Sequence, residues 1–285
     1  MVSTSLTEAI VRVTKSSVEP LRLFCFHHAG GHEKSSFMGW QRKLGDLAEV
    51  VPVRLPYDDV SSPAGRGAGS PDVARMIERI NAEIDPWAGT PHVFYGHSMG
   101  ALVAYQVTRL RQKLALPLPE RLLVGAYPGP HLRHRLTGAT RLPDTALRAL
   151  LPEQPAHRSQ SVRKALEQTA MTRLRAHLGI CDAAVSVPGR EAEAAPPAGS
   201  RPLLCPIDVF TGRGDAMVTP AGAAAWRLHT QAGCRVHQMP GGHFFTRDSA
   251  ESKNAFFARL AVILAECVPA TSGDFRDRQH RMASR

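Results

Sequence analysis

A serine held between two glycines is the residue of this 285-residue sequence that is best placed for chemistry. The run Gly96-His97-Ser98-Met99-Gly100 matches G-x-S-x-G, a pattern that holds a nucleophilic serine on a sharp turn between a strand and a helix. The apolar run His92–Tyr95 precedes this motif, and helix-forming residues follow it from Ala101 onward. The two glycines let strand and helix approach each other, and the N-terminus of a helix favours an anion. The pattern therefore predicts a nucleophilic Ser98; the alternative is an ordinary turn serine.

A serine hydroxyl is a weak nucleophile unless a base removes its proton, so one of the 13 histidines is expected to act as that base. His243 lies in a Pro-Gly-Gly-His-Phe-Phe segment between the last predicted strand and the last predicted helix. A loop at that place can reach Ser98. His229 and His237 fall inside a predicted helix and a predicted strand, so we expect surface or structural roles for them. We predict His243 as the base.

The acid that orients this base comes before the histidine in chains that carry this motif. Asp215 closes the segment Thr-Gly-Arg-Gly-Asp at the end of a predicted strand, where two glycines free the turn. Asp208 lies inside that strand and is expected to point into the sheet packing. The loop after the preceding strand, residues 127–130, contains no carboxylate. We therefore predict Asp215 as the acid, with capping of the following helix as the alternative role.

An oxyanion formed by attack of the serine needs two backbone N–H donors. The residue after the nucleophile, Met99, is expected to provide one, and the glycine-rich loop 27–31 the other. We favour Ala29 as the second donor, with His28 in reserve. The histidines in this loop have no carboxylate or further histidine at ligand-like spacing, so we expect no metal and no cofactor.

The predicted catalytic residues lie far apart in the sequence, so the fold must bring their loops together. Short apolar runs alternate with amphipathic ones, which predicts a mostly parallel sheet covered by helices on both faces. Ser70-Pro71-Asp72 is a helix start signal, and a stripe of apolar residues follows it. The predicted strands are 21–28, 50–55, 92–95, 122–127, 207–211 and 235–239, and the predicted helices include 101–111, 221–231 and 250–266.

The stretch from about 131 to 201 interrupts this alternation, because it contains no candidate strand. We predict helices over 144–151 and 161–178, forming a lid, and a flexible Pro/Ala-rich return over 187–202; a separate second domain is the alternative. Residues 1–20 are expected to be a flexible leader without the apolar core of a signal peptide. Residues 21–268 then form one domain including the lid, and residues 269–285 a basic flexible tail.

The net charge of +10 and the five scattered cysteines bear on partners and compartment. Basic clusters favour either solvated surfaces or a landing surface for an acidic partner. Nucleic acid is disfavoured, because aromatic residues make up only 6% of the chain and no binding motif accompanies the charge. No apolar run is long enough to span a bilayer. An odd number of cysteines without a signal peptide indicates free thiols in a cytoplasmic protein, and nothing in the sequence requires more than a monomer.

Together the motifs resemble the type II thioesterases, stand-alone editing enzymes of polyketide and nonribosomal peptide synthesis with an α/β-hydrolase fold. The resemblance covers about residues 20–265 and rests on the loop segment 23–31, the serine motif 94–101, the segment 210–215, and Trp226 followed by 240–245. The catalytic triad of the family falls on Ser98, Asp215 and His243.

Three segments depart from the family pattern. His27 stands where the family usually has proline. Leu55-Pro56-Tyr57-Asp58-Asp59 replaces a Pro-Gly-Arg-like segment, and Leu174-Arg175-Ala176-His177 replaces a Leu-Arg-Ala-Asp-like stretch of the lid. The departures leave the hydrolytic residues intact and bear on acyl specificity.

The resemblance implies hydrolysis of acyl groups held as thioesters on the phosphopantetheine arm of acyl or peptidyl carrier proteins. Carrier proteins are generally acidic, so the positive charge is expected to steer them toward the lid side. Three alternatives stay open at this point. The acyl-enzyme could pass to a hydroxyl or amine, as in a cyclase or acyltransferase; the chain could be a generic esterase; or it could be a non-catalytic interaction protein.

Overall fold

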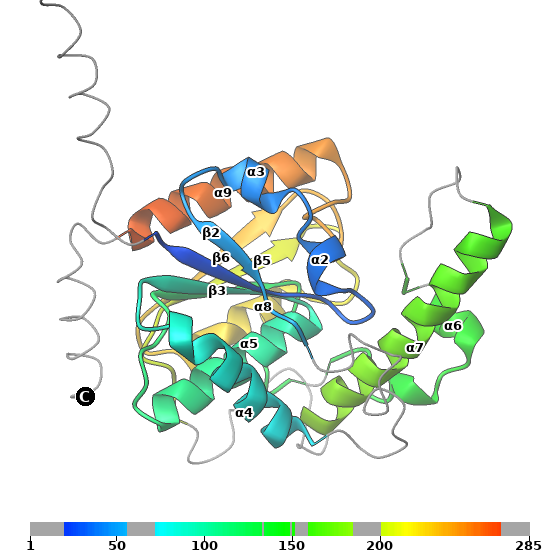
Figure 1. The fold of residues 1–285 in the computed structure, drawn as a ribbon, viewed down its shortest axis with the longest axis horizontal. Helices are drawn as coiled ribbons and strands as arrows, with labels where there is room; N and C mark the ends of the chain where they lie inside the picture. The colour runs from blue at the N-terminus through cyan, green and yellow to red at the C-terminus, as the bar shows by residue number, and fades with distance from the viewer. Residues whose placement is uncertain are drawn as a thin grey trace, which may run out of the picture.

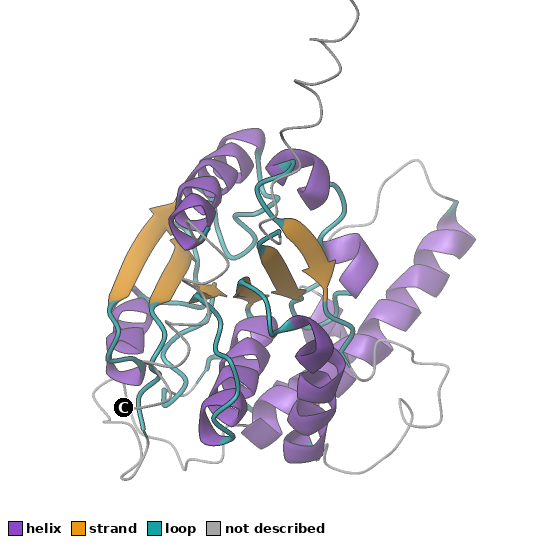
Figure 2. Ribbon diagram, turned by 60° about the vertical axis from the view of Figure 1, so that its left-hand side comes forward, coloured by secondary structure: helices purple, strands orange, loops and turns teal. Residues whose placement is uncertain are grey.

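A six-stranded sheet forms the centre of the molecule, and helices pack on both of its faces (Figures 1 and 2). The computed structural model describes residues 20–55, 72–132, 134–148, 150–151, 159–184 and 201–268. The predicted leader before residue 20, the tail 269–285, the segment 56–59 and nearly all of the predicted return 187–202 lie outside the described residues.

All described strand pairs of the sheet are parallel, in the order β2-β1-β3-β4-β5-β6. This arrangement confirms the predicted parallel sheet with helices on both faces. β1 ends at Phe26, so His27 and His28 belong to the following loop and not to the predicted longer strand. The strands are β1 (Arg22–Phe26), β2 (Glu49–Pro52), β3 (His92–His97), β4 (Arg121–Gly125), β5 (Ile207–Gly212) and β6 (Cys234–Met239).

The helices and 3-10 helices alternate with these strands, as the sequence pattern indicates. Their bounds are α2 (Glu33–Ser36), α3 (Trp40–Leu44), α4 (Val73–Ile84), η2 (Asp85–Trp87), α5 (Met99–Lys113), η3 (Ala139–Arg141), α6 (Asp144–Arg148), α7 (Gln160–Ala184), α8 (Pro220–Ala224), η4 (Ala225–His229) and α9 (Ala250–Cys267).

Two hydrophobic clusters lie on the two faces of the sheet. Successive side chains of a strand point to opposite faces. On β1, Phe24 and Phe26 therefore pack with α4 and α5, whereas Leu23 and Cys25 pack with α3 and α9. Figure 1 shows the same division, with α3 beside α9 on one side of the sheet and α4 beside α5 on the other.

Side-chain caps determine where two of the covering helices begin. Asp72 accepts a hydrogen bond from the Arg75 amide at 3.0 Å and starts α4, as the helix start signal predicts. Ser249 and Ser252 cap each other reciprocally at the start of α9. Each cap satisfies amides that have no partner within the helix.

The prediction of one helix over 221–231 is wrong, because the segment divides into α8 and η4. Residues three apart lie on the same side of a 3-10 helix. Trp226 and His229 are both buried on the inner side of η4, and the Trp226 indole N–H donates to a main-chain carbonyl after β4 at 2.8 Å. These contacts hold the second half of the segment against the core, where it winds as a 3-10 helix.

Between β4 and β5 the described residues form helices and no strand of the sheet, and α7 is longer and α6 shorter than predicted. Arg175 of α7 donates to Asp144 at 3.0 Å and to the main-chain oxygen of Thr140 at 2.9 Å. Asp182 accepts from the Gly138 amide at 2.6 Å. The first half of α7 lies away from the sheet with α6, whereas Ile180 near its C-terminal end belongs to the main core cluster (Figure 1). We call residues 131–184 the helical insertion.

None of the helices among the described residues is both long and apolar enough to cross a membrane.

Candidate active site

Ser98 occupies a strained turn between the last residue of β3 and the first residue of α5. Its φ is 54° and its ψ is −121°, a conformation that non-glycine residues adopt rarely and at an energetic cost. The Ser98 amide donates to the carbonyl of Gly125 at 2.7 Å, which ties the turn to β4. Ser98 is 6% exposed. The turn presents the hydroxyl at the carboxyl edge of the sheet, beside the N-terminus of α5.

The glycines around Ser98 are required by backbone contacts. A Cβ at Gly96 would lie 2.2 Å from the carbonyl oxygen of Gly100. A Cβ at Gly100 would lie 2.1 Å from the carbonyl oxygen of Phe26. Both distances are far below van der Waals contact, and both obstacles are backbone atoms, so the turn tolerates no side chain at either position.

The structure brings together the three side chains that the sequence predicts for the triad. The Ser98 hydroxyl lies 3.1 Å from Nε2 of His243, and Nδ1 of His243 lies 2.9 Å from Oδ2 of Asp215. The Asp215 side chain is fully buried, and its Oδ1 accepts a hydrogen bond from the Met217 amide at 2.8 Å. Since a carboxylate accepts, the imidazole carries its proton on Nδ1, and Nε2 is free to accept from the serine.

The loops that carry Asp215 and His243 touch each other through glycine. A Cβ at Gly212, the last residue of β5, would lie 2.1 Å from the carbonyl oxygen of Gly242. Asp248 accepts a hydrogen bond from the Gly242 amide at 2.7 Å, which holds the loop from the other side. These backbone contacts hold the loops of Asp215 and His243 at the distance that their hydrogen bond requires.

His97 also holds the loop that carries His243, a role that the sequence reasoning missed. Its Nε2 donates to the carbonyl of His243 at 2.9 Å, and its Nδ1 accepts from the hydroxyl of Tyr95 at 3.0 Å. Burial, followed by the charge of His243, lowers the pKa of His97 well below its ordinary value, so the ring stays neutral. A signal was available only for the contact with Tyr95, because Tyr95 and His97 stand two residues apart in β3 and share one face.

The predicted oxyanion donors come from two segments, the start of α5 and the loop after β1. Met99 is the first residue of α5, where amides have no partner within the helix. Ala29 follows β1 and packs against both the main core and the helical insertion. The reserve residue His28 is buried beside Ala29, and burial, followed by the charge of Arg247, lowers its pKa to about 3.

The helical insertion contacts the loop 27–31 directly; because this loop carries the predicted oxyanion donor Ala29, we call it the oxyanion loop. The amide of Gly30 (φ 77°) donates to Nδ1 of His177 on α7 at 3.1 Å. The ring of His177 lies 5.4 Å, centroid to centroid, from the ring of His27. Two of the three segments that depart from the family pattern therefore meet each other at the active site. The third, at residues 55–59, is outside the described residues except for Leu55.

The other candidates from the sequence have structural partners. His229 is buried in a chain with Tyr105 and His131, at 2.9 Å and 2.6 Å. Asp208 is fully buried in the sheet, where His237 contacts it at 2.7 Å together with two arginines. Burial by itself raises the pKa of Asp208, but these partners hold it at about 2.

No three His, Cys, Asp or Glu side chains of the described part of the chain lie together in a way that could hold a metal ion.

Comparison with known proteins identifies the family of the chain. A model of the thioesterase domain family matches residues 21–259. The gramicidin S biosynthesis protein GrsT of Aneurinibacillus migulanus is 30% identical over 264 residues, which cover 90% of this chain and 94% of GrsT. The thioesterase RedJ of the prodiginine pathway in Streptomyces coelicolor superimposes with a TM-score of 0.68 at 30% identity, covering 88% of this chain and 95% of RedJ.

A second solved structure is the type II thioesterase BorB of the borrelidin biosynthetic cluster. It superimposes with a TM-score of 0.66 at 27% identity, over 87% of this chain and 94% of BorB. The family match covers well over half of the chain, and the sheet order and helical layers are those of an α/β-hydrolase fold. This chain belongs to the thioesterase domain family of serine hydrolases.

Proposed function

We propose that this chain is a type II thioesterase of polyketide or nonribosomal peptide synthesis, which hydrolyses acyl groups from the phosphopantetheine arm of carrier proteins. The observation that carries the proposal is the hydrogen-bonded chain Ser98–His243–Asp215, with 3.1 Å and 2.9 Å between its polar atoms. Similarity to GrsT, RedJ and BorB supports the thioester as the bond attacked and the synthases as the setting.

In the first half of the reaction, Nε2 of His243 removes the proton of Ser98 as Oγ attacks the thioester carbonyl. Asp215 stabilises the imidazolium that forms and holds it in position. The amides of Met99 and Ala29 donate hydrogen bonds to the oxyanion. The C–S bond then breaks, the imidazolium gives its proton to the departing thiolate, and the acyl group remains on Ser98.

In the second half, water replaces the thiol. His243 takes a proton from the water as its oxygen attacks the acyl-serine ester. The tetrahedral intermediate collapses, the bond between Oγ and the acyl carbon breaks, and His243 returns a proton to Ser98. The carboxylic acid leaves, and the site returns to its starting state.

Charge and thiol chemistry support a partner and a compartment for the reaction. A net charge of +10 favours binding to the acidic surface of a carrier protein. The sequence contains no nucleic-acid-binding motif that would explain this charge otherwise. All five cysteines are free thiols, which is typical of a reducing cytoplasm. We propose that the enzyme works there as a monomer, without metal or cofactor.

The test uses carrier proteins loaded with a panel of acyl groups, with released products identified by mass. Wild type is expected to release free acids, and Ser98→Ala to release none above background. Ser161→Ala on the exposed start of α7 is the matched control. Labelling by a fluorophosphonate should disappear only with Ser98→Ala. Release of a lactone or transfer product, or full activity of Ser98→Ala, would contradict the proposal.

A further inference from the structure

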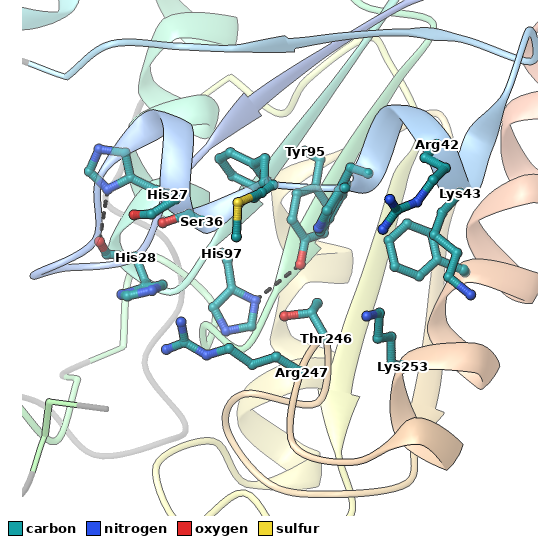
Figure 3. A pocket seen from close by; sticks show the side chains of 16 residues that line it. His27, His28, Ser36, Arg42, Lys43, Tyr95, His97, Thr246, Arg247 and Lys253 are labelled. Atoms are coloured by element: carbon teal, nitrogen blue, oxygen red, sulfur yellow. Dashed lines mark hydrogen bonds between the residues drawn. The ribbon is translucent and has the colours of Figure 1, made fainter. Parts of the chain in front are cut away.

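A cationic cavity of about 170 Å³ lies beside the active site but outside its catalytic machinery (Figure 3). None of the proposed catalytic and oxyanion residues lines it, so no thioester reaches Ser98 through this cavity. Its walls include α3, the start of α9 and the loops after β1 and β6. The same two loops carry Ala29 and His243. The cavity therefore lies at the margin of the active site.

Four cationic side chains line this cavity and no carboxylate does. Arg42 and Lys43 extend from α3, across the cavity from Lys253 of α9, and Arg247 comes from the loop after β6 (Figure 3). In the part of the chain that the structure describes, none of the four forms an ion pair. All four residues are exposed. Their charge is therefore open to the acidic groups of another molecule.

Arg247 shows how close this charge lies to the proposed base. Its guanidinium carbon lies 4.2 Å from the centroid of the Phe244 ring, and that ring lies 5.1 Å, centroid to centroid, from the ring of His243. The neighbouring carboxylate of Asp248 does not line the cavity and accepts from the Gly242 amide at 2.7 Å. Positive charge is thus held within two ring contacts of the triad.

An exposed apolar side chain stands at the same cavity. Met38, between α2 and α3, lines it and is 82% exposed, more than any other large apolar side chain that the structure describes. Interfaces between proteins are enriched in Met and Arg. The methionine side chain is unbranched and flexible, so it adapts to different partner surfaces. An adaptable apolar group beside unpaired cations suits a partner surface that combines acidic and apolar side chains.

We propose that the acidic carrier protein docks on this surface, which we call the docking surface and which consists of Met38, Arg42, Lys43, Arg247 and Lys253. Acidic side chains of the carrier contact the four cations, and apolar side chains contact Met38. The phosphopantetheine arm stays outside the cavity and reaches the triad from the surface, where the His243 side chain is 10% exposed. The inference rests on the proposed function, and it assigns docking to α3 and α9 rather than to the lid side.

Two thioesters of the same acyl group separate docking from chemistry: the acyl-carrier protein and the small acyl-pantetheine. Arg42→Gln and Lys253→Gln should each raise the KM for acyl-carrier protein about threefold, and together about tenfold, as expected for exposed charge pairs. Met38→Ser should raise it several-fold. None of these changes should alter kcat or KM for acyl-pantetheine. Added salt should raise the KM for acyl-carrier protein more in wild type than in the double variant, because salt screens exposed charges.

Two other exposed lysines serve as matched controls. Lys113 is the last residue of α5, at the opposite edge of the sheet, and Lys164 lies on α7 in the helical insertion. Lys113→Gln and Lys164→Gln should leave the KM for both substrates unchanged. A rise with Lys164→Gln but not with Arg42→Gln would assign docking to the helical insertion and overturn the proposal. An equal rise with Lys113→Gln would also overturn it, because net charge alone would then explain the effect.

Binding is measured apart from hydrolysis with Ser98→Ala and a fluorescently labelled acyl-carrier protein. Adding Arg42→Gln and Lys253→Gln to Ser98→Ala should raise the Kd about tenfold at equal thermal stability. An unchanged Kd, or an equal loss of activity with acyl-carrier protein and acyl-pantetheine, would overturn the docking surface. If wild type hydrolyses no thioester, the proposed function fails, whereas the Kd still decides whether the carrier docks here.

Discussion

The hydrogen bond between α7 and the oxyanion loop is the contact whose removal is most informative about catalysis. The Gly30 amide donates to Nδ1 of His177 at 3.1 Å, and both Leu151 and Leu174 lie against Gly30. His177→Leu keeps an apolar side chain in this buried place but removes the acceptor. The Gly30 amide then loses its partner, and the loop is free to move the adjacent Ala29 amide.

The size of the effect follows from the cost of that unpaired amide. A buried donor without a partner costs about 1–3 kcal/mol. If the loop moves to avoid this cost, the correctly placed loop becomes about 5- to 150-fold less populated, since roughly 1.4 kcal/mol corresponds to a factor of ten. Loss of one oxyanion donor costs about 10²–10³ in kcat, which sets the upper limit. We expect kcat to fall about 10- to 100-fold.

The assay is steady-state hydrolysis of an acyl-thiol substrate, with kcat and KM determined separately. KM should change little, because the donor acts on the transition state. His177→Asn retains an acceptor near the position of Nδ1, so it should recover most of kcat. Thermal unfolding monitors the fold of each variant. Wild-type kcat in His177→Leu, or no recovery in His177→Asn at equal stability, would refute the reasoning.

Three further changes follow from the site and the core. Asp215→Asn should lower kcat roughly 10⁴-fold with an unchanged fold, because the amide no longer orients the base; kinetics and circular dichroism check this. Gly100→Ala should cost about 3 kcal/mol or more in urea unfolding, because the Cβ would meet the Phe26 carbonyl oxygen at 2.1 Å. In Gly89→Ala the Cβ has open space, so the change should stay within about 0.5 kcal/mol. Burial, followed by the charge of His131, lowers the pKa of His229 to about 3, so the free energy of unfolding should fall by about 1.4 kcal/mol per pH unit for this group below pH 6.5.

The sign of this last effect comes from proton binding. Between pH 6.5 and the folded pKa of about 3, the unfolded state binds a proton at His229 that the folded state does not. Stability is therefore present above pH 6.5 and is lost as the pH falls. His229→Gln should reduce the slope in urea titrations between pH 7 and pH 5, and an unchanged slope would contradict the assignment. Near wild-type kcat in Asp215→Asn would contradict the role of the acid, and equal stability of Gly100→Ala and Gly89→Ala would contradict the steric argument.

Much of the site could be predicted because its requirements are local. Gly96 and Gly100 flank Ser98 since backbone atoms approach within 2.2 Å of where a Cβ would stand, and that constraint is visible as a motif. Asp215 and His243 each follow an apolar strand, and parallel strands end at one edge of the sheet. The strand pattern therefore predicts that Asp215 and His243 lie at the same edge of the sheet.

Other parts depended on contacts between distant segments. The segment 221–231 contains ordinary helix-forming residues, yet its second half is wound as η4, with Trp226 and His229 buried against distant segments. The roles of His97 and His177 come from partners 146 and 147 residues away along the chain, the carbonyl of His243 and the amide of Gly30. No spacing rule relates such pairs.

The sequence by itself predicted the sheet and the three side chains that the structure brings together as the proposed nucleophile, acid and base, because turn geometry and strand alternation are properties of neighbouring residues. Only the tertiary structure decided how α7 holds the oxyanion loop and how cations from α3 and α9 come to line one cavity. Those residues are scattered in the chain and become neighbours only when both faces of the sheet are covered. Their contacts therefore exist only in the folded protein and cannot be read from any one segment of the sequence.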